Sequence, residues 1–272
     1  MKKILGLIKR IIKKTLRIIN MPLFKLQQIY FQIVGSNVEC NICHYKAHVF
    51  NSDSWHLYCN CPYCSSGVRQ RLLMASLSSL DNFSFDNIIS NKKILHFAPE
   101  KSLGKIIQRT AKEYRTADFF TEGYSYDKID YNIDISDMKA IENESFDCVI
   151  ACDVLEHVPD HIGGIREVYR ILNKGGCCIF TVPQKDNLKV TYEDLSITDK
   201  KERERVFGQY DHLRIYGDDF ITMLQDSGFE VTAVNESFFI KDNVDHYVLF
   251  PPILSKHPLA TNYRKIFFGK KI

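Results

Sequence analysis

The sequence predicts an α/β fold in which a buried, mostly parallel sheet is covered by helices. Three observations within residues 146–184 support this prediction. The apolar run from Cys148 to Cys152 is typical of a strand that is buried on both faces. Apolar residues at helical spacing follow at Ile165, Val168, Tyr169 and Leu172. The stretch from Asn173 to Gly176 then ends the helix, because glycine adopts the left-handed angles of a helix C-terminus, and a second apolar strand follows.

Length and charge limit the classes of protein that remain. A chain of 272 residues can hold one α/β domain with a small additional unit. Residues 1–38 contain eight lysines and arginines and no acidic residue, and subtracting these charges from the net charge of +3 leaves −5 for the remainder. Proteins that bind a phosphate backbone usually carry their basic residues on the folded domain, so nucleic acid is a secondary candidate.

The N-terminal segment, residues 1–36, predicts a basic amphipathic helix over residues 2–19. Its apolar residues gather on one side, opposite the lysines and arginines: Ile4, Leu7, Ile8, Ile11, Ile12, Leu16, Ile18 and Ile19. We expect residues 1–19 to lie on an anionic membrane surface, although such a helix can also pack on its own domain or on a partner. The uncharged apolar stretch from Ile4 to Ile8 is too short to span a bilayer or to form a signal peptide.

Two Cys-x-x-Cys pairs, separated by seventeen residues, predict a zinc ribbon over residues 37–67. The expected ligands are Cys40, Cys43, Cys61 and Cys64. Four thiolates can complete a tetrahedral Zn²⁺ site, which would stabilise a stretch too short to form a core of its own. Cys59 and nearby histidines are rival ligands, and four structural thiols without metal are the alternative. The odd number of cysteines, nine in all, favours a reduced, cytoplasmic compartment.

An apolar helix is predicted directly after the ribbon. Arg69 and Arg71 lie at its start, where we expect solvated helix charges; the alternative is that they reach an acidic substrate.

The motif FDxVxxxxVLEHVxD, which begins at Phe146, and the motif xExYRxLxxGG after it resemble class I S-adenosylmethionine-dependent methyltransferases of the type-11 domain family. The resemblance covers roughly residues 92–250, and some relatives carry a similar Cys₄ ribbon. It implies a doubly wound, Rossmann-like sheet in a domain over residues 68–252. The closing antiparallel strands are expected at residues 229–234 and 246–250, with residues 253–272 as a C-terminal tail.

The resemblance places the S-adenosylmethionine loop after the first strand, at His96, Ala98 and Glu100. The family usually has glycines in this loop, because glycine lets the backbone approach the methionine end of the cofactor. This chain lacks them.

Three aspartates at later strand ends match the rest of the cofactor site. Asp118 matches the carboxylate that accepts the ribose hydroxyls. Asp134 matches the position near the adenine amine, with Ile135 packed against the ring, and Asp153 ends the fourth strand. The alternative for Asp118 and Asp134 is a surface aspartate that caps a strand or a helix.

Candidate acceptor residues follow the fourth and fifth strands. His157 could act as a base, or could be a structural histidine that fixes the turn. A long polar insertion contains the motif DHxRxYG, which resembles the ribbon-bearing subgroup and places Asp211, His212 and Arg214 at the acceptor pocket. The alternative is that Arg214 and Asp211 pair to hold the loop, with His212 capping the next helix.

Together these features predict a cytoplasmic, membrane-peripheral methyltransferase with structural zinc. A sugar hydroxyl on a glycan or lipid-linked glycan is the preferred acceptor, because the resemblance includes relatives associated with surface-polysaccharide synthesis. A ribosomal or transfer RNA methyltransferase and a non-catalytic scaffold with an altered cofactor loop are the alternatives.

Overall fold

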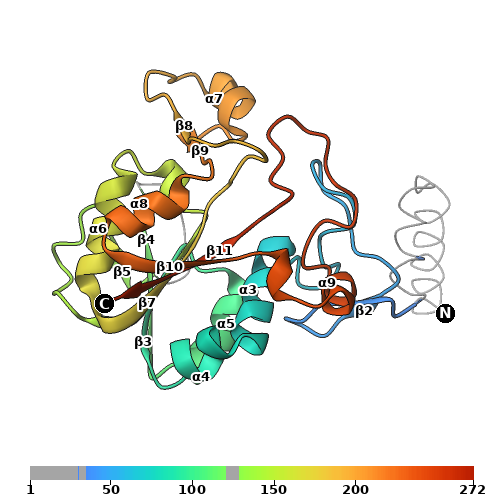
Figure 1. Ribbon diagram of the computed structural model, residues 1–272, viewed down its shortest axis with the longest axis horizontal. Helices are drawn as coiled ribbons and strands as arrows, with labels where there is room; N and C mark the ends of the chain where they lie inside the picture. Colours follow the sequence, from blue (N-terminus) through green and yellow to red (C-terminus); the bar gives the residue numbers. More distant parts are fainter. Residues whose placement is uncertain (1–29, 31–34, 121–128) are drawn as a thin grey trace, which may run out of the picture.

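The computed structural model describes residue 30 and residues 35–120 and 129–272 (Figure 1). The predicted amphipathic helix at residues 2–19, and with it the expected membrane contact, lies outside the described residues. Among the helices in the described ranges, none has the length and apolar character needed to cross a membrane.

A seven-stranded sheet forms the centre of the molecule, in the order β10-β11-β7-β6-β3-β4-β5. The strands are β3 (Lys93–Phe97), β4 (Glu113–Asp118), β5 (Tyr131–Asn132), β6 (Phe146–Cys152), β7 (Leu172–Thr181), β10 (Phe229–Val234) and β11 (Ile266–Lys271). The pairs from β5 to β7 are parallel, and β11 runs antiparallel to both β7 and β10. The structure therefore confirms the predicted mostly parallel sheet with an antiparallel closing strand.

Helices cover both faces of this sheet (Figure 1). One face packs against α6 (His161–Ile171) and α8 (Phe220–Asp226). The other packs against α3 (Val68–Ser79), α4 (Phe85–Ile88), α5 (Lys101–Thr110) and α9 (Lys241–Tyr247). Because successive side chains of a strand point to opposite faces, Cys148 lies in the core under α3 while Val149 lies in the core under α6.

The C-terminal part of the sequence folds differently from the prediction. Residues 246–250 are not a strand, because α9 runs through Lys241–Tyr247 and Val248 then turns the chain with a left-handed φ of 49°. The closing strand is β11, which lies within the predicted tail and beyond the predicted domain end at residue 252. Phe267 and Phe268 enter opposite cores, so this strand is buried on both faces even though lysines surround it in the sequence.

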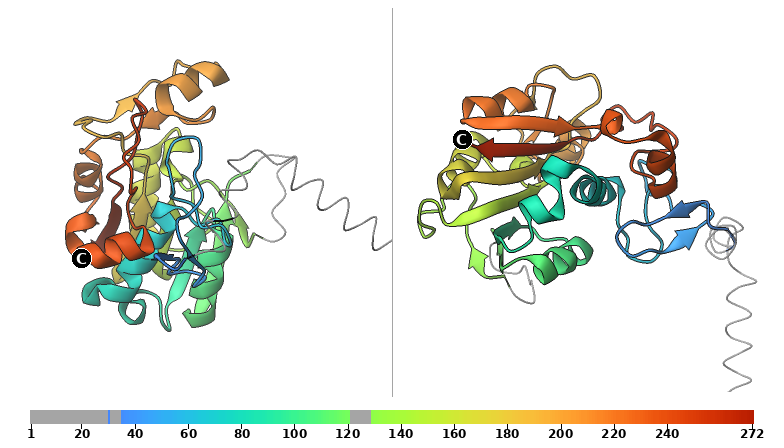
Figure 2. Two further views of the ribbon diagram at one scale, coloured as in Figure 1. Left: turned by 90° about the vertical axis from the view of Figure 1, so that its right-hand side faces the viewer. Right: turned by 60° about the horizontal axis from the view of Figure 1, so that its bottom comes forward.

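The two Cys-x-x-Cys pairs form matching turns next to a small hairpin of β1 (Val38–Glu39) and β2 (Lys46–Ala47). In the first turn the His44 amide donates to Cys40 O at 2.8 Å, and in the second the Ser65 amide donates to Cys61 O at 3.0 Å. Both donors adopt left-handed φ angles near 60°. Figure 2 shows this ribbon at one end of the molecule, beside α9.

Arg71 on α3 fastens the ribbon to the body. Its guanidinium is fully buried and donates to the carbonyls of Ser66 and Cys59 in the ribbon segment. It also donates to Tyr247 O and Val248 O, each at 2.9 Å, at the end of α9. The sequence alternative of a solvated charge is therefore wrong for Arg71.

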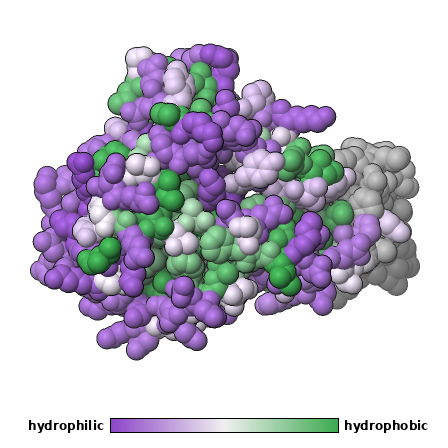
Figure 3. Space-filling view, in the orientation of Figure 1, coloured by the Kyte–Doolittle hydropathy of each residue, from purple (hydrophilic) through white to green (hydrophobic). Residues whose placement is uncertain are grey.

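Apolar side chains are exposed where the ribbon meets the segment after α9. Ile253 and Leu254 are about half exposed, and together with Tyr58 they line a cavity of about 540 Å³. A bridge between Leu57 and Ile253 joins the two segments. Figure 3 shows apolar surface at this end of the face that it presents.

We predict that Arg71→Ala lowers the free energy of unfolding by more than about 2 kcal/mol, because it leaves several buried carbonyls without a donor. Urea denaturation measures this change. Arg109→Ala on the exposed surface of α5 is the control and should change the value by less than about 0.5 kcal/mol. Equal losses for the two variants would show that Arg71 does not hold the ribbon.

Candidate functional site

The carboxyl ends of β3, β4, β5 and β6 lie along one edge of the sheet, because these strands are parallel neighbours. Each strand ends at, or within three residues of, an acidic residue: Glu100, Asp118, Asp134 and Asp153. Open α/β sheets bind their ligands at this edge. The structure thus brings together the strand ends that the sequence assigns to a cofactor.

The loop after β3 has a left-handed backbone conformation, typical of glycine, at an alanine. Ala98 adopts a φ of 44°, in the left-handed region, and its amide donates to Ala117 O on β4 at 2.9 Å. This conformation costs a residue with a side chain about 1–2 kcal/mol. The altered sequence therefore changes the side chains of the cofactor loop but retains the left-handed conformation that glycine favours.

His96 contacts the cofactor loop through Glu100 and the neighbouring strand through Tyr114. Its ring is fully buried, with Nδ1 3.0 Å from the Tyr114 hydroxyl and Nε2 3.2 Å from Glu100 Oε2. Burial opposes ionisation of Glu100, but the hydrogen bond with His96 and the positive charge of Arg69 together lower the Glu100 pKa. His96 therefore positions Glu100, and its place in the cofactor site stays a prediction.

Asp153 lies between two arginines from distant parts of the chain. Arg264 Nη1 is 2.7 Å from Asp153 Oδ1, and Arg69 Nε is 3.4 Å from Oδ2. Burial opposes the charge of Asp153, yet Arg264 and Arg69 hold its pKa well below the ordinary value. Arg69 also pairs with Glu100 at 2.8 Å, so it links the strand ends of β3 and β6. The sequence alternative of a solvated charge is wrong for Arg69 as well.

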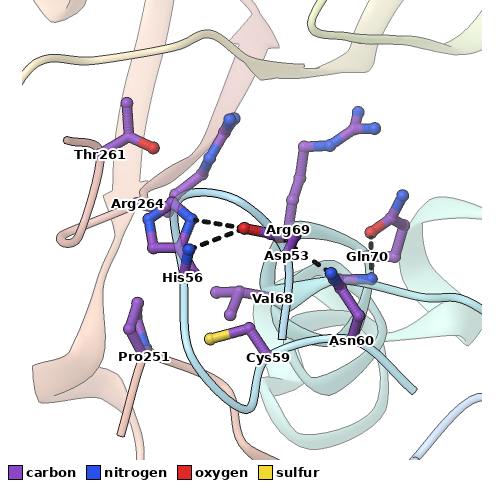
Figure 4. Close-up of a pocket in the computed structure, with 11 residues that line it drawn as sticks. Asp53, His56, Cys59, Asn60, Val68, Arg69, Gln70, Pro251, Thr261 and Arg264 are labelled. Atoms are coloured by element: carbon purple, nitrogen blue, oxygen red, sulfur yellow. Dashed lines mark hydrogen bonds and ion pairs between the residues drawn. The ribbon is translucent and has the colours of Figure 1, made fainter. Parts of the chain in front are cut away.

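A small cavity of about 180 Å³ opens beside these arginines (Figure 4). Figure 4 shows Arg69, Arg264 and His56 around it, with Asp53 accepting hydrogen bonds from the loop between the cysteine pairs. The ribbon segment therefore forms one wall of the region next to Asp153.

Asp118 and Asp134 stand at the strand ends that the sequence predicts. Asp118 Oδ1 accepts from the Phe119 amide at 2.8 Å. Asp134 Oδ1 accepts from both the amide and the hydroxyl of Ser136. Ile135 is only 2% exposed and lies in the core beside Gly164. This burial corrects the expectation that Ile135 packs against a bound ring.

A larger cleft of about 490 Å³ lies beyond Asp153. Its wall includes residues of the sheet edge, the insertion, the ribbon and the C-terminal segment: Trp55, His56, Asp153, Glu156, His157, Pro183, His212 and Arg264. Trp55 packs against Gly208, whose left-handed φ of 96° and missing side chain leave room for the indole ring. The structure therefore places the predicted residues His157, His212 and Asp153 on one cleft.

Glu156, His157 and His212 form a compact group on the cleft wall. The rings of His157 and His212 meet edge to face, with centroids 4.7 Å apart. Burial lowers the pKa of His212 to about 4, so its ring is neutral at neutral pH. Glu156 is 1% exposed. Its burial is the main cause that raises its pKa well above the ordinary value, and the negative charge of Asp153 raises it further.

Asp211 and Arg214 contact residues of this wall. Asp211 Oδ2 is 3.4 Å from His157 Nδ1. Arg214 is fully buried, pairs with Glu193, and donates to the carbonyls of Leu155 and Val158. The structure thus places Arg214 in the attachment of the insertion to the sheet edge, and the cleft-lining position expected from the sequence is not observed.

Two residues that line the cleft were not predicted from the sequence. Trp55 is the single tryptophan of the chain, but no motif surrounds it. Arg264 lies in the segment predicted as a C-terminal tail, 111 residues after Asp153. The pairing of β11 with β7 and β10 brings that segment back to the sheet.

The four predicted zinc ligands lie together. Cys40 Sγ is 3.7 Å from Cys64 Sγ, Cys43 Sγ is 3.6 Å from Cys61 Sγ, and all four sulfurs lie within 4.8 Å of one another. A tetrahedron with zinc–sulfur bonds of about 2.3 Å places its sulfurs about 3.8 Å apart, so the group fits zinc. Cys59 lies outside it and donates to Leu57 O.

The comparisons with known proteins agree with this architecture. A family model described as "Methyltransferase domain" matches residues 44–234. An S-adenosylmethionine dependent methyltransferase from Mesorhizobium loti is 14% identical, with a TM-score of 0.50 over 76% of this chain and 100% of that chain. Phosphoethanolamine N-methyltransferase 2 from Haemonchus contortus, solved with S-adenosyl-L-methionine, is 15% identical, with a TM-score of 0.46 over 75% of this chain and 52% of that chain.

A protein from Streptomyces fradiae, described as an uncharacterized 37.1 kDa protein in transposon TN4556, is 30% identical over 102 residues. The match spans 35% of this chain and 27% of that protein. At 14% identity, the likeness to the Mesorhizobium loti methyltransferase supports the fold alone. The family model, however, covers most of the chain, from the ribbon to β10. The chain therefore belongs to the methyltransferase domain family and has the fold of S-adenosylmethionine-dependent methyltransferases.

Proposed function

We propose that this chain transfers a methyl group from S-adenosylmethionine to a hydroxyl group. The observation that carries the proposal is the carboxyl edge of the sheet, where the left-handed Ala98 loop stands next to Asp118 at the end of β4. Bound S-adenosylmethionine supplies a methyl carbon that is open to displacement. Asp118 would accept the ribose hydroxyls, and Asp134 would lie at the adenine end.

The protein's contribution to such a displacement is mainly to hold donor and acceptor in line. Asp153 stands between the cofactor edge and the cleft, and its ion pairs with Arg69 and Arg264 fix its position. His212, neutral at neutral pH, and His157 could accept the acceptor's proton. Asp211 would orient His157 through its contact with Nδ1.

A sugar hydroxyl on a glycan or lipid-linked glycan is the acceptor that we favour. The cleft of about 490 Å³ offers the aromatic rings of Trp55 and Phe207 among carboxylates, histidines and Arg264. A sugar ring presents apolar C–H faces and polar edges, which suit such a wall. A protein surface that binds the phosphate backbone of RNA needs basic residues. The chain after residue 38 carries a net negative charge, which disfavours RNA as the acceptor.

The remaining parts of the proposal concern metal and location. The Cys₄ group would bind zinc with no open position, so its role would be structural. None of the nine cysteines forms a disulfide, which supports a cytoplasmic location. Residues 1–19 would bring the enzyme to an anionic membrane surface, near a lipid-linked acceptor.

We predict that Asp118→Ala weakens the binding of S-adenosylhomocysteine at least tenfold, because the ribose hydroxyls lose a charged acceptor. Isothermal titration calorimetry measures this affinity. Asp226→Ala, an exposed position at the end of α8, removes the same charge and should leave the affinity unchanged. Absence of binding by the folded wild-type protein would contradict the proposed activity.

Incubation with labelled S-adenosylmethionine and separate pools of glycan, lipid-linked glycan and RNA tests the acceptor. We expect label in one of the two glycan pools, and greater incorporation in the lipid-linked pool if the membrane placement holds. Label in RNA alone would replace the proposed acceptor, and binding of the cofactor without transfer to any pool would favour the scaffold alternative.

We predict that Cys61→Ser removes one tightly bound zinc ion per chain and destabilises the ribbon, because a hydroxyl is a poor substitute for a thiolate ligand. Mass spectrometric metal analysis of protein purified without chelator measures the zinc. Cys59→Ser is the matched control, since Cys59 lies in the same segment outside the Cys₄ group. Wild-type protein without zinc would contradict the prediction.

A further inference from the structure

The group formed by Glu156, His157 and His212 has the composition of an open metal site. One carboxylate oxygen and one ring nitrogen from each histidine lie within 4.8 Å of one another. Glu156 and His157 belong to the short helix η2 (Leu155–His157) after β6, and His212 comes from the insertion. All three line the same cleft.

The contacts of the two histidines leave one ring nitrogen of each with a free lone pair. His212 Nδ1 is 3.2 Å from Phe207 O. A carbonyl can only accept, so Nδ1 carries the hydrogen and Nε2 keeps its lone pair. His157 Nδ1 lies beside the carboxylate of Asp211, at 3.4 Å, which favours the same tautomer. A carbonyl or carboxylate behind the ring is the usual support of a histidine that binds metal.

Glu156 supplies a second, independent observation. Its side chain is 1% exposed, and its Oε2 has no hydrogen-bond partner in the part of the chain that the structure describes. A buried carboxyl oxygen without a partner is costly and needs an explanation. A metal ion held with the two imidazoles would supply the missing partner.

We propose that Glu156, His157 and His212 bind a divalent transition-metal ion on the wall of the cleft. Two imidazoles and one carboxylate suit zinc, iron, cobalt or nickel, whereas magnesium and calcium prefer oxygen ligands alone. Three protein ligands leave at least one position open, as in catalytic zinc sites. The site is separate from the Cys₄ group, which offers sulfur ligands and no open position.

The place of this ion gives it a role that rests on the proposed methyl transfer. With their free ring nitrogens bound to the ion, His157 and His212 would no longer act as bases themselves. An acceptor hydroxyl bound at the open position would instead lose its proton more readily, and the proton would pass to water in the cleft. The oxygen would then form its bond to the methyl carbon, while the carbon–sulfur bond breaks and both of its electrons return to sulfur. Atoms and charge balance, since the positive charge of the donor leaves as the released proton.

Titration of cobalt into full-length protein that carries one zinc ion per chain, on the Cys₄ group alone, tests the site without cofactor or acceptor. We expect one further equivalent of Co²⁺ to bind, with weak visible bands and none of the sulfur-to-cobalt charge transfer that a Cys₄ site gives. No further equivalent in folded protein would overturn the proposal. Charge-transfer bands would also overturn it, because the cobalt would then lie on the cysteines.

Three variants identify the ligands. Glu156→Gln, His157→Gln and His212→Gln should each weaken binding of the further equivalent at least tenfold. His246→Gln, on α9 and away from the cleft, is the control and should bind as the wild type does. Retention of the further equivalent by all three variants would overturn the assignment. Glu156→Gln preserves side-chain volume, and circular dichroism shows whether each variant is folded.

Failure of this proposal is distinguishable from failure of the proposed function. Methyl transfer by protein that carries zinc on the Cys₄ group alone would overturn the role of the second ion and leave the activity intact. Binding of the second ion without transfer to any acceptor would leave the metal site intact and contradict the activity.

Discussion

The buried guanidinium of Arg71 is the interaction on which the arrangement of this molecule depends. It joins α3 to the ribbon through Ser66 and Cys59, and to the end of α9 through Tyr247 and Val248. A charge this deeply buried is tolerated only when its donors all find acceptors. With the ribbon held in this way, Trp55 and His56 reach the cleft and complete its wall.

The same helix carries Arg69, two residues earlier and directed toward the sheet edge. There it meets Glu100 and Asp153, so the helix that anchors the ribbon also organises the charges beside the cofactor loop. Ala98 and Asp153 both adopt left-handed backbone angles at this edge although neither is glycine. Such strain persists where surrounding contacts determine the backbone, and it gathers at functional sites. The pairing of Asp153 with Arg264 and Arg69 is one such contact.

Several features followed from local patterns alone. The Cys-x-x-Cys pairs predicted the Cys₄ group, because each pair forms its own turn within five residues. The apolar run at residues 148–152 and the stripe through Val168 predicted β6 and α6, because strand and helix periodicity act over short distances. The closing strand shows the limit of local patterns, because the strand predicted at residues 246–250 is wrong. The lysines in β11 make its sequence look exposed, and β11 is buried because it pairs with β10 and β7.

By itself the sequence determined the parallel strands from β3 to β7, the family and the acids at the ends of β4 and β6, since these depend on residues close together in the chain. The tertiary structure alone decided which side chains face the cleft. Arg214 enters the support beneath the insertion, whereas Arg264 crosses from the last segment to Asp153. The positions of Arg214 and Arg264 depend on the packing of elements more than fifty residues apart in the chain. Local sequence periodicity does not predict which groups a buried charge will contact.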